Sequence, residues 1–229
     1  MGAYQRPASL EEAISTISSG DWTVLAGGTD FYPARVGKPV RENILDISAI
    51  SGLRGIREEA NGWFIGATTT WSDIVRSDLP PCFDGLKQAA REVGGVQIQN
   101  AGTVCGNICN ASPAADGVPP LLALDAEVVV VGASGSEMVP LSQFILGNRR
   151  TARRPDQIVT GLHIPVVSSR GRSAFYKLGA RRYLVISIAM AACVLDADEA
   201  GAITRAAVSV GACSEVARRL PELEADLVG

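Results

Sequence analysis

The chain has 229 residues, of which 47% are hydrophobic and 20% are charged, the balance of an ordinary globular protein. Its net charge of −3 argues against a nucleic-acid surface as its main role, and no apolar run reaches the roughly 18 residues of a membrane helix. The five cysteines are an odd number without framework spacing, which indicates a reduced, cytoplasmic protein.

The first third of the chain predicts a capped helix, a glycine turn and a hairpin. Ser9 and Glu12 form a capping-box pattern in front of a helix at 10–18. A short buried strand then runs into the glycine turn at 27–30, which has the sequence GGTD and opens the backbone where a helix would begin. A helix is expected around 31–36 and strands at 42–47, 53–57 and 63–66, the last two joined at Asn61 and Gly62.

The stretch from 101 to 116, AGTVCGNICNASPAAD, organises the middle of the chain, and we expect it to be a loop. Its small residues cannot build a core, but they let backbone N–H groups approach an anionic ligand. The turn at 27–30 has the same character, so the two loops are predicted to hold a dinucleotide together. A helix is expected before the stretch at 83–93, and a helix or turn at 119–124 and strands at 126–131, 137–140 and 158–164 after it.

Four arginines lie between Gly147 and Pro155. A solvated loop is the favoured interpretation, and an electropositive rim near bound phosphates or a partner subunit is the alternative. Residues 168–172 are the best candidate for a linker. Strands are expected at 174–177, 188–195 and 206–211, with a final helix near the chain end. The irregular mixture of helices and hairpins predicts an α+β fold rather than a doubly wound parallel sheet.

Few side chains suit acid–base chemistry, so no catalytic residue and no metal site is predicted. The single histidine, His163, lies in a predicted strand, and the patterns GxxxxGK[ST] and GxGxxG are absent. Cys105 and Cys109 cannot complete a four-cysteine cluster and are interpreted as small fillers. The backbone donors that remain suit a bound cofactor that carries the chemistry itself.

Three motifs occur together in this chain: AGGTD at 26–30, TVCGN at 103–107 followed by ASPAAD at 111–116, and FYKLGARR at 175–182. This combination resembles the FAD-binding medium subunit of molybdenum hydroxylases, the family of xanthine dehydrogenase and carbon monoxide dehydrogenase. The segment 155–165 also fits, and the resemblance covers essentially the whole chain.

The resemblance implies a fold and a set of cofactor contacts. The fold would be a PCMH-type FAD-binding domain at 1–167, with lobes at about 1–55 and 56–167, followed by a small α+β C-terminal domain at 171–229. The pyrophosphate and ribose would contact Ala26, Gly27, Gly28, Thr29, Asp30 and Phe31, with Thr103, Gly106, Asn107, Cys109 and Asn110 on the other side. Asp116 would bond a ribityl or ribose hydroxyl, and Val159 would pack on the ring system. Lys177 would lie near the pyrimidine edge of the flavin with Arg181 alongside, where both cations would favour the reduced, anionic flavin.

The chain departs from the family pattern at two points. Cys105 stands where the family usually has the first glycine of Gly-Gly-Asn. Medium subunits of the family also continue with further helices beyond the point where this chain stops, so the C-terminal domain is expected to be either incomplete or naturally short.

The family implies an electron-transfer flavoprotein subunit. A molybdopterin-binding large subunit would oxidise an organic substrate, and an iron–sulfur small subunit would pass the electrons to FAD and on to NAD+ or another acceptor. A stand-alone flavin reductase of the same superfamily is one alternative, although it would need a proton donor that the sequence does not identify. A non-catalytic scaffold subunit is the other, and Cys105 is its best support. Neither a nucleic-acid partner nor a membrane span is expected.

Overall fold

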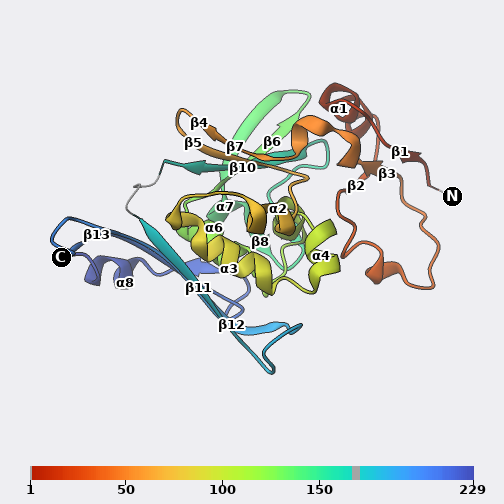
Figure 1. Cartoon of the computed structure of the whole chain (residues 1–229). Coiled ribbons are helices and arrows are strands. Elements are labelled where there is room, and N and C mark those ends of the chain that lie inside the picture. Colours follow the sequence, from red (N-terminus) through yellow and green to blue (C-terminus); the bar gives the residue numbers. More distant parts are fainter. Residues whose placement is uncertain (1, 167–170) are drawn as a thin grey trace.

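A computed structural model describes residues 2–166 and 171–229 of the chain, and it confirms the α+β class. A small N-terminal lobe lies at one end of the molecule, and the C-terminal strands lie at the other (Figure 1). Between them, helices are packed beneath a central sheet. No helix in the described part of the chain combines the length and apolar character needed to cross a membrane.

The N-terminal lobe is built on a parallel three-stranded sheet in the order β1-β3-β2. Its strands are β1 (Tyr4–Gln5), β2 (Thr23–Leu25) and β3 (Ile44–Asp46). The helix α1 (Leu10–Ser18) begins as predicted, because the Ser9 hydroxyl accepts a hydrogen bond from the Glu12 amide at 3.2 Å. The helix expected around 31–36 is shorter than predicted. It is a single 3-10 turn, Pro33–Arg35, since the backbone is already extended at Val36 and left-handed at Gly37.

The central sheet is antiparallel, with the strand order β4-β5-β10-β6-β7. The predicted hairpin at Gly62 joins β4 (Ile56–Glu59) to β5 (Gly62–Gly66), and a second hairpin joins β6 (Glu127–Gly132) to β7 (Gly135–Pro140). The strand β10 (Ile158–Pro165) lies between these two hairpins and is buried along almost its whole length. A separate small pair consists of β8 (Ile145–Gly147) and β9 (Arg150–Thr151).

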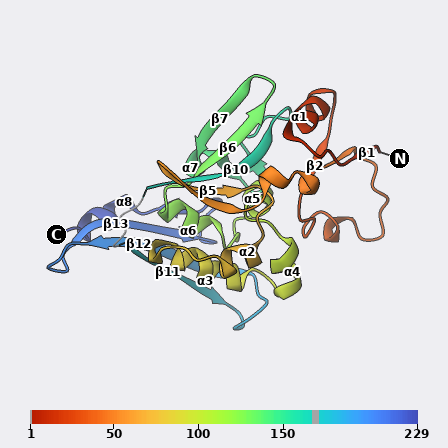
Figure 2. The same ribbon diagram turned by 45° about the horizontal axis from the view of Figure 1, so that its top comes forward.

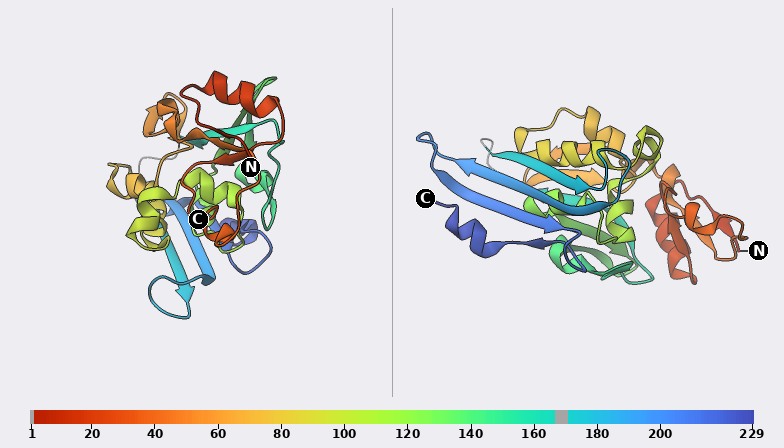
Figure 3. Two further views of the ribbon diagram at one scale, coloured as in Figure 1. Left: turned by 90° about the vertical axis from the view of Figure 1, so that its right-hand side faces the viewer. Right: turned by 90° about the horizontal axis from the view of Figure 1, so that it is seen from below.

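The C-terminal sheet is antiparallel in the order β11-β12-β13-β14. Its strands are β11 (Arg172–Gly179), β12 (Ser187–Ala197), β13 (Ile203–Gly211) and β14 (Arg218–Arg219), and α8 (Pro221–Asp226) follows them. The expected linker at 168–172 falls mostly outside the described residues. Helices α3 (Asp84–Glu92) and α6 (Val118–Ala123) pack against this sheet, so they form a layer between it and the central sheet (Figures 2 and 3). Their buried side chains, Leu86 and Leu121 among them, belong to one continuous core.

The stretch expected to be a loop at 101–116 is helical over 104–110, so that expectation was wrong there, whereas 111–116 contain no helix or strand. It contains the end of α4 (Val96–Ala101) and all of α5 (Val104–Asn110), and the remaining helices are α2 (Trp71–Arg76) and α7 (Leu141–Phe144). The small residues of α5 have weak helix propensity, but Val104 and Ile108 are fully buried in the core. Tertiary packing of one helical face therefore stabilises a segment whose local sequence favours a loop.

Candidate functional site

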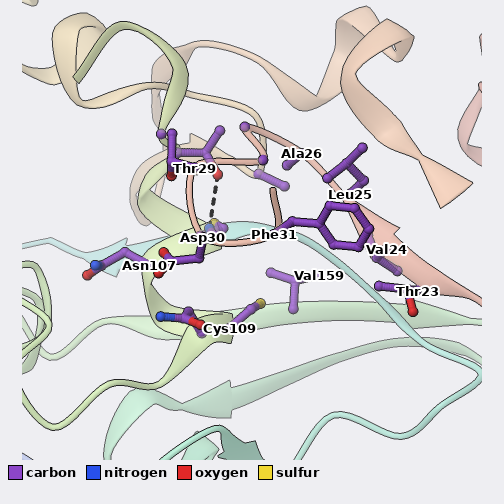
Figure 4. Close-up of a pocket in the computed structure, with 18 of the residues that line it drawn as sticks. Thr23, Val24, Leu25, Ala26, Thr29, Asp30, Phe31, Asn107, Cys109 and Val159 are labelled. Carbon is purple, nitrogen blue, oxygen red and sulfur yellow. Dashed lines mark hydrogen bonds between the residues drawn. The ribbon is translucent and has the colours of Figure 1, made fainter. Parts of the chain in front are cut away.

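A cavity of about 740 Å³ lies where the N-terminal lobe meets α5 and the segment that leads into β10. Pockets for small ligands and cofactors usually measure roughly 300–1,000 Å³. Phe31 and Leu25 face Val159 and Cys109 across it (Figure 4). Most of the predicted cofactor residues line this cavity: Ala26, Gly27, Gly28, Thr29, Asp30, Phe31, Thr103, Gly106, Asn107, Cys109, Asn110 and Val159.

The turn after β2 approaches the α4–α5 junction as closely as the backbone permits. A Cβ atom on Gly27 would lie 2.0 Å from the carbonyl oxygen of Ala101, a distance that no side chain tolerates. Gly28 has a φ of +69°, and a Cβ there would lie 2.6 Å from the Tyr32 ring. Both positions therefore require glycine, one for the close approach and the other for the left-handed backbone.

Thr103 sets the start of α5 at the wall of the cavity. Its hydroxyl accepts a hydrogen bond from the Gly106 amide at 3.0 Å, which is an N-cap contact. A Cβ on Gly106 would come within 2.7 Å of that hydroxyl oxygen. Backbone hydrogen bonds from Val104 to Thr69 (3.0 Å) and from Trp71 to Gly102 (3.2 Å) tie this junction to α2. The α4–α5 junction is therefore fixed by the Thr103 cap and by the backbone hydrogen bonds to α2 and the residue before its cap.

The next turn of α5 brings one polar and two thiol side chains to the cavity. Oδ1 of Asn107 is buried and accepts no hydrogen bond from the part of the chain that the structure describes. Cys105 is 2% exposed and packs in the core, where burial raises the pKa of its thiol well above the usual value. Burial also raises the pKa of the Cys109 thiol to about 11, while the positive charge of Arg153 acts in the opposite direction. Both thiols are therefore protonated near neutral pH, and neither is an activated nucleophile.

Asp116 and Lys177 do not line the cavity, but they meet each other. Nζ of Lys177, on β11, donates to Oδ2 of Asp116 at 2.7 Å, and the two side chains are 7% and 9% exposed. The Ser187 hydroxyl, at the start of β12, donates to Oδ1 of Asp116 at 2.6 Å. One carboxylate therefore joins the segment after α5 to two strands of the C-terminal sheet, across 61 and 71 positions of sequence.

Arg181 lies in the exposed turn between β11 and β12. Its guanidinium hydrogen-bonds to the carbonyl oxygen of Leu184, with Nε at 3.1 Å. The residue is exposed and is not part of the cavity lining.

Three arginines outside the predicted cofactor contacts, Arg35, Arg149 and Arg153, also line the cavity. Arg149 and Arg153 line the cavity, although the run 147–155 favoured a solvated loop. The four arginines of this run are the feature of the sequence that could have indicated the site. The alternative interpretation, an electropositive rim near bound phosphates, agrees with the position of Arg149 and Arg153. Within residues 2–166 and 171–229, no group of three or more His, Cys, Asp or Glu side chains is placed to hold a metal ion.

Comparison with known protein families gives one match that covers most of the chain. Residues 1–167 match the family described as the FAD binding domain in molybdopterin dehydrogenase.

Individual relatives extend the similarity beyond that segment. The chain is 34% identical over 237 residues to the nicotinate dehydrogenase FAD-subunit of Eubacterium barkeri, covering 97% of this chain and 78% of that protein. It is 36% identical over 197 residues to the glyceraldehyde dehydrogenase medium chain of Sulfolobus acidocaldarius, covering 82% of this chain and 69% of that one. Among solved structures, carbon monoxide dehydrogenase from Hydrogenophaga pseudoflava superimposes with a TM-score of 0.88 at 29% identity, covering 100% of this chain and 80% of the matched chain.

Proposed function

The chain belongs to the family of FAD-binding domains of molybdopterin dehydrogenases, and we propose that it transfers electrons from an iron–sulfur partner to an external acceptor. It is the FAD-binding subunit of an oxidoreductase. The single observation that carries the proposal is the glycine-lined cavity between the N-terminal lobe and α5, because it brings together the glycine turn after β2 and the start of α5, which carry two motifs of the family.

The cavity fits a dinucleotide. Gly27 and Gly28 let the turn after β2 lie directly against Ala101 and Tyr32, which fixes the backbone of the turn at the edge of the cavity. Thr103, Asn107 and Asn110 add polar side chains to the lining, which suits the hydroxyl and phosphate groups of such a ligand. Apolar walls at Phe31 and Val159 complete the mixture of apolar surface and a few polar groups that cofactor sites share.

We assign the residues of the site to three roles. The glycine turn and α5 would hold the diphosphate and ribose, with Thr103 and Asn107 as the polar side chains. Asp116 would bond a ribityl or ribose hydroxyl. Lys177 would lie at the pyrimidine edge of the flavin with Arg181 alongside, where its ammonium group offers positive charge. Bound FAD supplies the redox chemistry, and this chain contributes binding, orientation and charge.

The partners follow from the names of the relatives. One is an FAD-subunit and the other a medium chain, which describe parts of larger assemblies. We infer an iron–sulfur small subunit and a molybdopterin-binding large subunit as partners, with NAD+ or another acceptor receiving the electrons. We also place the boundary between the FAD-binding domain and the C-terminal domain at 167–171.

The test is the flavin content of the complex purified with its partners. We expect a visible flavin absorbance band in the wild type and its loss in Gly28→Val, because valine both strains the left-handed backbone and meets Tyr32. Gly52→Val is the matched control, since a Cβ at Gly52 meets no atom within 4 Å. Circular dichroism and the presence of all partners in each purified complex show whether the variants fold and assemble.

A wild-type complex without flavin would overturn the proposal and leave the scaffold alternative. A folded, assembled Gly28→Val complex that keeps its flavin would contradict the assignment of the cavity.

A further inference from the structure

The four arginines between Gly147 and Pro155 divide into two pairs with different surroundings. Arg150 lies 4.0 Å from Glu215, and Arg154 lies 3.6 Å from Glu137 and 3.5 Å from Asp156. Arg149 and Arg153 instead line the cavity. Among the described residues, neither of these two has a carboxylate partner, so their positive charges are not neutralised by the protein.

The backbone holds both cavity arginines in place. The Arg149 amide donates to the carbonyl oxygen of Ala111 at 3.1 Å, directly at the end of α5. Its φ of +56° is rare for a residue with a side chain, and such conformations concentrate at functional sites. Nη1 of Arg153 donates to the carbonyl oxygens of Gln157 (2.7 Å), Arg154 (3.0 Å) and Pro155 (3.4 Å). The guanidinium of Arg153 is therefore fixed through one of its nitrogens.

The other charged side chains of the lining leave these two cations in excess. Arg35 also lines the cavity, but it is paired with Glu42 and lies 3.7 Å over the Phe31 ring. The carboxylates of the lining, Asp21 and Asp30, are exposed, and within residues 2–166 and 171–229 neither forms an ion pair with Arg149 or Arg153. The wall formed by α5 and the segment before β10 thus carries two uncompensated positive charges.

We propose that Arg149 and Arg153 form the cationic half of the diphosphate site of FAD and supply the charge that the two glycine-rich segments lack. This inference rests on the assignment of the cavity to FAD. Backbone N–H groups donate hydrogen bonds but carry no net charge, whereas the diphosphate carries two negative charges that must leave water. A guanidinium neutralises such a group and matches its oxygen geometry with paired donors.

The test compares FAD binding by two double variants of the full chain after removal of the bound flavin. Arg149→Gln/Arg153→Gln removes the cavity pair, and Arg150→Gln/Arg154→Gln removes the neighbouring pair from the same loop. Fluorescence titration with FAD at increasing potassium chloride gives the dissociation constant and its salt dependence. We expect the cavity variant to bind FAD weaker by roughly tenfold for each arginine. Its salt dependence should also be shallower than that of the wild type, because fewer charges remain to be screened.

The control variant should keep both the affinity and the salt dependence of the wild type. All titrations are made at a temperature at which circular dichroism shows each apoprotein to be folded, because Arg153→Gln also removes the hydrogen bonds to the carbonyl oxygens of Arg154, Pro155 and Gln157. The inference is overturned if the cavity variant binds FAD like the control, or if its affinity falls while its salt dependence is unchanged. Failure of the wild type itself to bind FAD is a different result, because it removes the flavin assignment and not only this refinement of it.

Discussion

The two ends of the candidate site satisfy their polar groups in opposite ways. At the glycine-rich end, Arg149 and Arg153 line the cavity without a carboxylate partner in the described chain. At the other end, Asp116 and Lys177 are buried against each other at 2.7 Å.

Because of this difference, the cavity end is preformed for a ligand, whereas the other end must rearrange before it can contact one. The cavity end can accept a ligand as it stands, because the cavity is already open and its arginines without carboxylate partners already line it. The other end, which we call the closed end, is the buried ion pair of Asp116 and Lys177, and it links the C-terminal sheet to the segment after α5. Lys177 can approach a ligand only if this ion pair is shared with the ligand or broken. Binding at the second end is therefore coupled to the contact between the sheet and the segment after α5.

The largest effect is expected from breaking the closed end. Lys177→Met leaves Asp116 buried with only Ser187 as partner, and loss of one member of a buried ion pair costs about 3–5 kcal/mol. We expect the free energy of unfolding measured in urea to fall by that amount.

Lys38→Met is the control, because Lys38 is exposed and its change should leave unfolding within the error of the measurement. Combining Lys177→Met with Asp116→Asn should recover part of the loss, since no charge then remains buried. Equal stability of Lys177→Met and the wild type would show that the closed end does not hold the sheet.

The sequence predicted the cavity end far better than the closed end, and the reason is the distance along the chain. The glycines at 27 and 28 and the cap at Thr103 are local signals, whose backbone requirements can be read from a few neighbouring residues. The contact between Asp116 and Lys177 spans 61 positions and depends on how α3 and α6 seat the C-terminal sheet. The resemblance named both residues, but no local pattern could pair them.

Two elements of the cavity end were still missed for physical reasons. The helix α5 exists because Val104 and Ile108 are buried, and burial cannot be read from a segment of small residues. Arg149 and Arg153 were indistinguishable from their neighbours in the sequence, because only the turn after β8 and the hydrogen bonds of the segment decide which arginines face the cavity.

A second, smaller effect is expected from overpacking the glycine turn. Gly27→Ala places a methyl group 2.0 Å from the Ala101 carbonyl oxygen, so the turn must move away from the α4–α5 junction. Overpacking costs about 1–3 kcal/mol, which corresponds to FAD binding weaker by about 5- to 150-fold if the displacement falls on the site. Titration of the apoprotein measures it, and Gly52→Ala is the neutral comparison. Unchanged affinity would mean that the close approach serves folding alone.

A third effect concerns the cap at the start of α5. Thr103→Ala removes the hydroxyl that accepts from Gly106, and loss of an N-cap costs about 1 kcal/mol. We expect this loss in urea unfolding of the apoprotein, whereas Thr103→Ser should retain most of the stability because its hydroxyl can make the same contact. If serine is as destabilising as alanine, packing of the methyl group and not the cap determines the effect.

The smallest effect at neutral pH is expected at Cys109, where burial raises the thiol pKa from 9.0 to about 11. The folded chain keeps a proton that an unfolded chain releases, so this contribution to stability is complete below the unfolded pKa and is lost as the pH rises through about 11.

Since only the thiolate reacts, iodoacetamide at a pH of about 7 to 9 should label the exposed Cys213 well before Cys109. Peptide mass spectrometry over time measures both rates in one sample. Because Cys109 lines the cavity and Cys213 does not, bound FAD should slow labelling at Cys109 alone. Equal slowing at both thiols would point to a global change in stability and not to occupation of the cavity.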